Sequence, residues 1–176
     1  MKPLRARYNK ITQMADRLLR EHSIITPPVP VDKIAKNLGV KLRYGRLGEV
    51  SGLLVRTNES ATIGVNVTQM RVRQRFTIAH ELGHLLLHQG IWSHKDEGFL
   101  VNFRSAKSSE ATNVEEIEAN FFAASILIPK QFLDQDNAIR ALDSDTAVRD
   151  LARKYNVSRH AMSLRLANVY GAHRPF

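Results

Sequence analysis

One stretch decides the fold: Phe76-Thr77-Ile78-Ala79-His80-Glu81-Leu82-Gly83-His84-Leu85-Leu86-Leu87-His88. Its apolar residues recur at helical spacing. On an α-helix, His80 and His84 lie one turn apart on the same face, so both imidazoles can bind one zinc ion. Glu81 lies beside them without being a ligand, where its carboxylate can accept a proton from a water molecule. The stretch therefore predicts a zinc-binding helix with an adjacent general base.

Zinc needs a third protein ligand, and this helix does not supply one. His88 lies about 12 Å along the helix from His80, too far to share one tetrahedral ion with both other histidines. The third ligand must therefore come from another element. Residues 114–124 are the best candidate, because they are predicted to form a second helix and carry three carboxylates.

The faces of this second helix distinguish the three carboxylates. Glu116 shares its face with Ala119, which would let the two helices approach closely, and with Asn120, which could hydrogen-bond a ligand. Glu118 shares a different face with bulky side chains, and Glu115 points elsewhere. We therefore predict that Glu116 is the third ligand, and that Glu115 and Glu118 are solvated near the helix N-terminus.

Composition excludes several other classes of protein. The 176 residues suit one domain, and the chain contains no Cys, which excludes disulfide scaffolds, thiolate zinc fingers, iron–sulfur ligation and cysteine nucleophiles. Six Lys or Arg residues lie within the first twenty residues, and no apolar run follows them. We therefore expect no signal peptide, no membrane span and a cytoplasmic location. The net charge of +9 is compatible with nucleic-acid contact, but a basic surface with at most weak contact is the simpler interpretation.

Hydrophobic periodicity and turn signals divide the chain into alternating elements. Helices are predicted over 4–20, over a short segment between Pro30 and Gly39, and over 71–88, 114–128 and 145–170, with β-strands over Val40–Tyr44, Ser51–Arg56 and Thr62–Val65 and a long loop over 90–113.

The C-terminal helical block has the spacing of a helix-turn-helix. Asn156 suits a turn position with positive φ, and Ser158 can cap the second helix. Arg159 and Arg165 are among the basic residues that flank the turn. The block is either a DNA-binding or repressor-docking module, or a helical pair that packs against the rest of the chain. We favour the second interpretation, because resemblance to a motif is weak support for a function.

Residues 76–88, together with the downstream segment Glu116–Pro129, resemble the ImmA/IrrE family of zinc metallo-endopeptidases. The marks of that family are the HELGH helix and a second helix with the pattern E-x-x-A-N-x-F-A-A ending in Pro. The resemblance implies that the first Glu of the second motif, Glu116, is the third zinc ligand, in agreement with the face argument. We expect an α+β fold: a zincin-like core with a small three-stranded sheet over 1–140, followed by a helix-turn-helix-like pair over 141–176 packed on it.

The resemblance also implies a function. A zinc ion held by His80, His84 and Glu116 would activate water for peptide-bond hydrolysis, with Glu81 as the general base. The implied substrate is a helix-turn-helix transcriptional repressor in a phage, mobile-element or stress response. The alternative is a non-enzymatic DNA- or repressor-binding regulator with a structural zinc. Glu81 separates the two, because a structural site closes its fourth position with a protein ligand and needs no carboxylate base.

Overall fold

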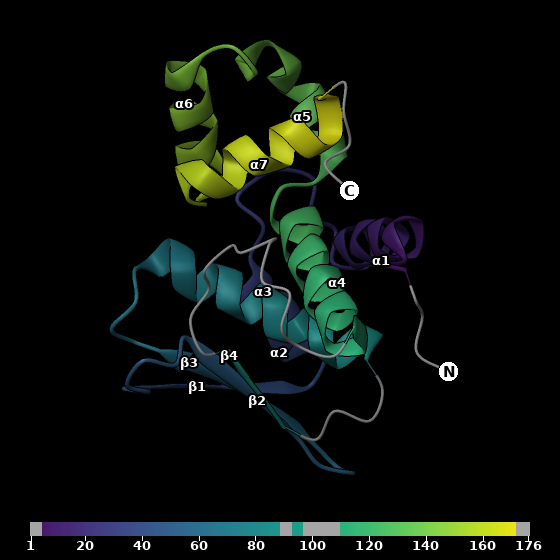
Figure 1. The fold of residues 1–176 in the computed structure, drawn as a ribbon, viewed down its shortest axis with the longest axis vertical. Helices are drawn as coiled ribbons and strands as arrows, with labels where there is room; N and C mark the ends of the chain where they lie inside the picture. The colour runs from purple at the N-terminus through teal and green to yellow at the C-terminus, as the bar shows by residue number, and fades with distance from the viewer. Residues whose placement is uncertain (1–4, 89–92, 97–109, 172–176) are drawn as a thin grey trace.

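The computed structural model describes residues 5–88, 93–96 and 110–171 and has an α+β architecture (Figure 1). Its elements are α1 (Tyr8–Glu21), α2 (Val31–Asn37), β1 (Val40–Gly45), β2 (Gly52–Arg56), β3 (Ala61–Asn66), α3 (Arg71–Leu87), β4 (Ser93–Asp96), α4 (Glu110–Leu127), α5 (Lys130–Gln135), the 3-10 helix η1 (Ala138–Ala141), α6 (Asp145–Tyr155) and α7 (Arg159–Tyr170). No helix in the described ranges is long and apolar enough to cross a membrane.

The sheet confirms the α+β class and differs from the expectation by one strand. Its order is β1-β3-β2-β4, with β1 parallel to β3 and with β2 antiparallel to both of its neighbours. The fourth strand, β4, pairs Ser93 with Val55 and Asp96 with Gly52. Its sequence is wholly polar, so alternation of apolar residues gives no sign of it.

The loop expected over residues 90–113 is consequently shorter than predicted. It contains β4, and helix α4 begins at Glu110 rather than near residue 114. The other residues of that loop lie outside the described part of the chain.

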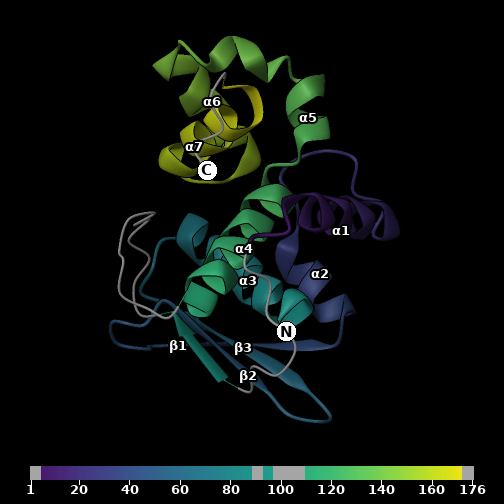
Figure 2. The same ribbon diagram turned by 45° about the vertical axis from the view of Figure 1, so that its right-hand side comes forward.

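Helix α3 lies between the sheet and α4 (Figure 2). Its buried residues therefore point to several sides rather than to one stripe. On the sheet side, Gly52 lies so close to the methyl group of Thr77 that a side chain at this position would clash with it. On the other side, α4 packs along α3, and α1 covers α4 with its stripe of Ile11, Ala15, Leu18 and Leu19. The helix that bears both histidines is thus held from two sides.

Helices α6 and α7 form the predicted pair. Asn156 has φ of 53° at the end of α6, and the Ser158 hydroxyl accepts a hydrogen bond from the backbone N–H of Ala161 at the start of α7. Both helices contribute buried apolar residues to the same core as α3 and α4. In Figure 1 the pair lies beyond the end of α4, on the side away from the sheet.

Two arginines connect this pair to the rest of the chain. Arg75 of α3 donates hydrogen bonds to the carbonyl oxygens of Val29 and Asn156, at 2.8 and 3.1 Å. Arg165 is only 4% exposed and donates to the carbonyl oxygen of Ile128 at the end of α4. Arg165, one of the basic residues that flank the turn in the sequence, therefore lies on the face of α7 that packs inward.

Candidate metal centre

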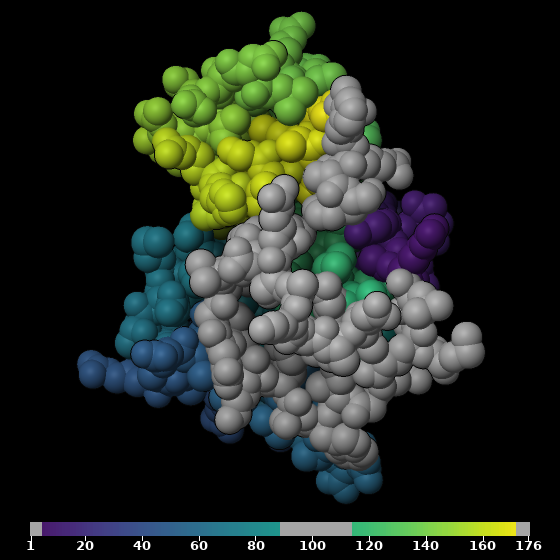
Figure 3. Space-filling model, in the orientation of Figure 1, coloured from purple at the N-terminus to yellow at the C-terminus, as the bar shows by residue number. Residues whose placement is uncertain are grey.

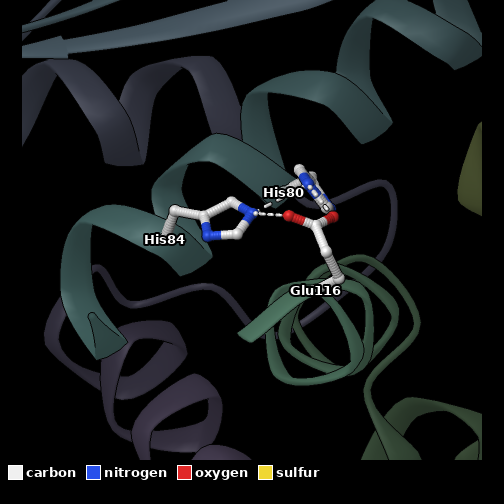
Figure 4. A group of neighbouring side chains, drawn as sticks. All are labelled: His80, His84 and Glu116. Atoms are coloured by element: carbon white, nitrogen blue, oxygen red, sulfur yellow. Dashed lines mark hydrogen bonds and ion pairs between the residues drawn. The ribbon is translucent and has the colours of Figure 1, made fainter. Parts of the chain in front are cut away.

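Two imidazole nitrogens and one carboxylate converge between α3 and α4 (Figure 4). The Nε2 atoms of His80 and His84 are 3.1 Å apart. Glu116 places one carboxylate oxygen 3.1 Å from Nε2 of His84 and the other 3.5 Å from Nε2 of His80. The two histidines are buried, and the Glu116 side chain is partly exposed.

The spacing of these atoms fits a metal ion of the size of zinc. Zinc lies about 2.0–2.2 Å from nitrogen and oxygen ligands, so two corners of its tetrahedron are about 3.3 Å apart. Nε2 of His84 lies 3.1 Å from Nε2 of His80 and 3.1 Å from Oε1 of Glu116, and both separations are close to that value. Nitrogen and carboxylate oxygen are also the donor types that zinc binds in proteins. The residues present therefore suit the ion.

The tautomer of His80 is set by Asn120 on α4. Nδ1 of His80 lies 2.9 Å from Oδ1 of Asn120, which accepts a hydrogen bond from the Nδ1–H group. The lone pair of His80 is therefore on Nε2, the atom that faces Glu116. Asn120 was expected to contact a ligand in this way, because it lies one helical turn after Glu116.

The tautomer of His84 is set by His88 and Glu118. Nε2 of His88 lies 3.1 Å from Oε2 of Glu118, and a carboxylate only accepts, so this nitrogen carries the proton. Burial lowers the pKa of His88 and so favours the neutral ring, in which Nδ1 is an acceptor when Nε2 carries the proton. Nδ1 of His84, 3.1 Å away, must then donate to it. The lone pair of His84 is thus on Nε2.

Glu118 contradicts the expectation that it is solvated. It is fully buried, at 0% exposed, and pairs with Arg7 at 2.6 Å between the terminal nitrogen and Oε2. Burial alone would raise the pKa of Glu118, but hydrogen bonds from Arg7 and His88 lower it below its usual value. The position of Glu118 on the apolar face of α4 indicated burial, but Arg7 lies 111 residues away and left no local signal.

Glu81 lies on α3 next to His80 and is fully buried. Its carboxylate is not one of the three groups that converge on the candidate metal position. Glu81 is thus the neighbour of His80 on α3 and lies outside the candidate set of ligands.

The sequence of this chain matches a known protein family. Residues 35–167 match the model of a peptidase family, Peptidase_M78, described as the IrrE N-terminal-like domain. The chain belongs to this family. The ImmA/IrrE resemblance seen in the sequence is therefore confirmed.

Other comparisons inform the fold of this IrrE N-terminal-like domain. A Mycobacterium tuberculosis transcriptional regulator of known structure is similar over 90% of this chain, with a TM-score of 0.62 and 14% identity. The chain spans 46% of the length of that regulator. A search of curated proteins finds no match.

Gly83 explains how closely the two helices of the IrrE N-terminal-like domain approach. A Cβ atom there would lie 3.1 Å from Cα and 3.2 Å from the carbonyl oxygen of Ala119, both backbone atoms of α4. Because Glu116 lies one turn before Ala119, any outward movement of α4 also moves Glu116 away from the histidines. The glycine between the two histidines therefore sets the distance between the candidate ligands.

We expect Gly83→Val to lower the stability of the protein by about 1–3 kcal/mol, because two methyl groups must be accommodated against backbone. Zinc affinity should fall as well, because α4 must move. Denaturant unfolding of the metal-free protein and a zinc titration measure the two effects. Gly45→Val is the control, since no described heavy atom lies within 4 Å of its Cβ position and its φ lies outside the left-handed region. Unchanged zinc affinity in folded Gly83→Val would contradict the spacing argument.

Proposed function

We propose that this chain is a zinc-dependent endopeptidase that cleaves a helix-turn-helix transcriptional repressor. The observation that supports it most is the convergence of Nε2 of His80, Nε2 of His84 and the Glu116 carboxylate within 4.8 Å of one another, where the helix that bears both histidines also carries a buried Glu81. Membership of a peptidase family points to the same class of reaction.

In this proposal, His80, His84 and Glu116 would hold the zinc ion. Asn120 and His88 would keep the two imidazole rings oriented through their Nδ1 atoms. When bound with three protein ligands, zinc polarises a carbonyl and lowers the pKa of water to about 7. The Glu81 carboxylate accepts a proton from the attacking water as the water oxygen bonds to the carbonyl carbon. It then delivers this proton to the amide nitrogen as the C–N bond breaks.

The substrate class is the less direct part of the proposal. It rests on the family resemblance, and the structural likeness to a transcriptional regulator is compatible with it. A cytoplasmic location and a division near residue 140 belong to the same proposal. In this division, residues 1–140 form the peptidase unit and residues 141–176 a helical pair packed on it.

Cleavage of a small helix-turn-helix repressor, taken from a gene adjacent to that of this chain, tests the proposal. The purified protein is incubated with the repressor and one equivalent of zinc, and the fragments are identified by mass spectrometry. We expect one or a few defined cuts that a chelator abolishes and added zinc restores. Intact repressor under all these conditions, with zinc demonstrably bound, would count against the peptidase.

A DNA-binding regulator with a structural zinc remains the alternative, and the α6–α7 pair is the observation in its favour. Part of α7 lies on the molecular surface (Figure 3), and Arg159 at its first position is exposed. A protein that reads bases through this helix would lose affinity steeply with salt, and it would lose sequence preference on Arg159→Ala.

We expect the opposite result for DNA. Binding should be weak and non-specific, and Arg159→Ala should change it by no more than about threefold, because Arg165 on the same helix is buried. Fluorescence anisotropy with unrelated duplexes at several salt concentrations measures this. A nanomolar, sequence-specific complex at physiological salt would favour the regulator instead.

A further inference from the structure

A continuous series of polar contacts leads from the N-terminal end of α1 to one of the candidate metal ligands. Arg7 precedes α1 and binds Glu118, Glu118 binds His88, and His88 binds His84. The distances along the series are 2.6, 3.1 and 3.1 Å. The segment before α1 and the first half of α4 are thus connected to His84 through His88.

Among the described residues, Arg7 donates three hydrogen bonds to Glu118. Its Oε1 accepts from the backbone N–H of Arg7 at 2.8 Å and from Nε at 2.9 Å, and its Oε2 accepts from the terminal nitrogen. The same terminal nitrogen donates to the carbonyl oxygen of Leu87, in the last turn of α3. Because Glu118 is fully buried, water cannot replace these donors when they are lost.

His88 transmits the position of Glu118 to His84. It follows α3 and is 5% exposed, so packing leaves its ring little freedom. Its two nitrogens contact two different partners, Glu118 on one side and His84 on the other. A displaced Glu118 carboxylate would therefore leave the His88 ring without the contact that orients it toward His84.

The two histidines of the candidate site are supported very differently. Nδ1 of His80 contacts Asn120, on the same helix as Glu116. His84 is oriented through three residues, the last of which, Arg7, lies in a different part of the chain and has a side chain that is 30% exposed. Partners that orient a histidine ligand from behind commonly change metal affinity 10- to 100-fold when they are removed.

We propose that Arg7 is a positioning residue for the metal centre, which acts on His84 through Glu118 and His88. The inference rests on the proposed zinc site and deepens it, because it makes the segment before α1 part of what holds the ion. Displacement of this segment by a partner or by proteolysis would weaken zinc binding without touching a ligand.

The experiment compares zinc affinity in the full chain for Arg7→Gln, Arg7→Lys and Glu118→Gln. Affinity is measured by competition with a chromophoric chelator, and the cobalt-substituted proteins are compared by their visible absorption spectra. The control is Arg17→Gln on α1, because Arg17 is exposed and, within the described residues, its ion pair is with Glu21 one turn away.

We expect Arg7→Gln and Glu118→Gln to weaken zinc binding about 10- to 100-fold and to alter the cobalt spectrum. The zinc affinity of Arg7→Lys should lie between the affinities of these two variants and that of the wild type. Lysine keeps the positive charge but cannot bridge both carboxylate oxygens. The variant that combines Arg7→Gln with Glu118→Gln should bind zinc no more weakly than the single variant with the lower zinc affinity, because both substitutions break the same series of contacts. Arg17→Gln should bind zinc like the wild type.

A purely structural role for Arg7 predicts a different pattern. Unfolding of the metal-free protein would then shift to lower denaturant, while the zinc affinity and the cobalt spectrum of the folded protein stayed unchanged, and this result overturns the inference. If Glu118→Gln does not fold, the partly exposed Arg7 variants decide the outcome. A wild type that binds no zinc overturns both proposals, whereas zinc binding without proteolysis overturns only the proposed function.

Discussion

Glu81→Gln is expected to lower peptide-bond hydrolysis about 100- to 10,000-fold while one zinc ion stays bound. Glutamine has the shape of glutamate but cannot accept a proton from water at neutral pH. Glu81 lies outside the group of three converging ligands, so its replacement leaves those three atoms in place. The rate is measured as kcat/KM on a peptide that spans the cleavage site, and bound zinc is measured on the same sample.

The matched control for this experiment is Glu115→Gln, a second carboxylate near the site and outside the ligand set. Its rate should stay within a few-fold of the wild type. Loss of zinc from Glu81→Gln would show that Glu81 helps to hold the ion rather than to move a proton. Undiminished hydrolysis would remove Glu81 from the reaction altogether.

The parts of this site that sequence reasoning predicts are those with a helical period. His80 and His84 share a face because they are four residues apart, and Asn120 faces the same way as Glu116 for the same reason. Ala119 is small on the same face of α4, where that helix lies against Gly83 of α3. In each case the signal lies within one turn of helix, where the sequence determines the geometry almost alone.

The parts that sequence reasoning misses depend on contacts between distant segments. Arg7 and Glu118 are 111 residues apart, and no local pattern pairs them. A carboxylate on the apolar face of α4 nevertheless required a buried cation, so the assignment of Glu118 to solvent overlooked its own helical face. Strand β4 was missed for a related reason, because its pairing with β2 compensates for a polar sequence with no preference for a strand.

Glu116→Ala is expected to weaken zinc binding by about 100-fold or more, because it removes one of the three proposed ligands. This loss should exceed that of the variants at Arg7 and Glu118, which act on a ligand only indirectly. Its side chain is 38% exposed, so the stability of the metal-free protein should change by no more than about 0.5 kcal/mol. A zinc titration and a denaturant titration on the same preparations give the two numbers.

Glu118→Ala should lower the stability of the metal-free protein more than it lowers zinc affinity. Removal of a buried carboxylate leaves the guanidinium of Arg7 without its partner, which should lower stability by about 3–5 kcal/mol, while zinc affinity falls only through the loss of orientation at His84. The two glutamates lie two residues apart on α4, yet one should act mainly on the metal and the other mainly on the fold. If the larger loss of zinc affinity occurred at Glu118, Glu116 would not be the third ligand, and its short distances to the two histidines would have another cause.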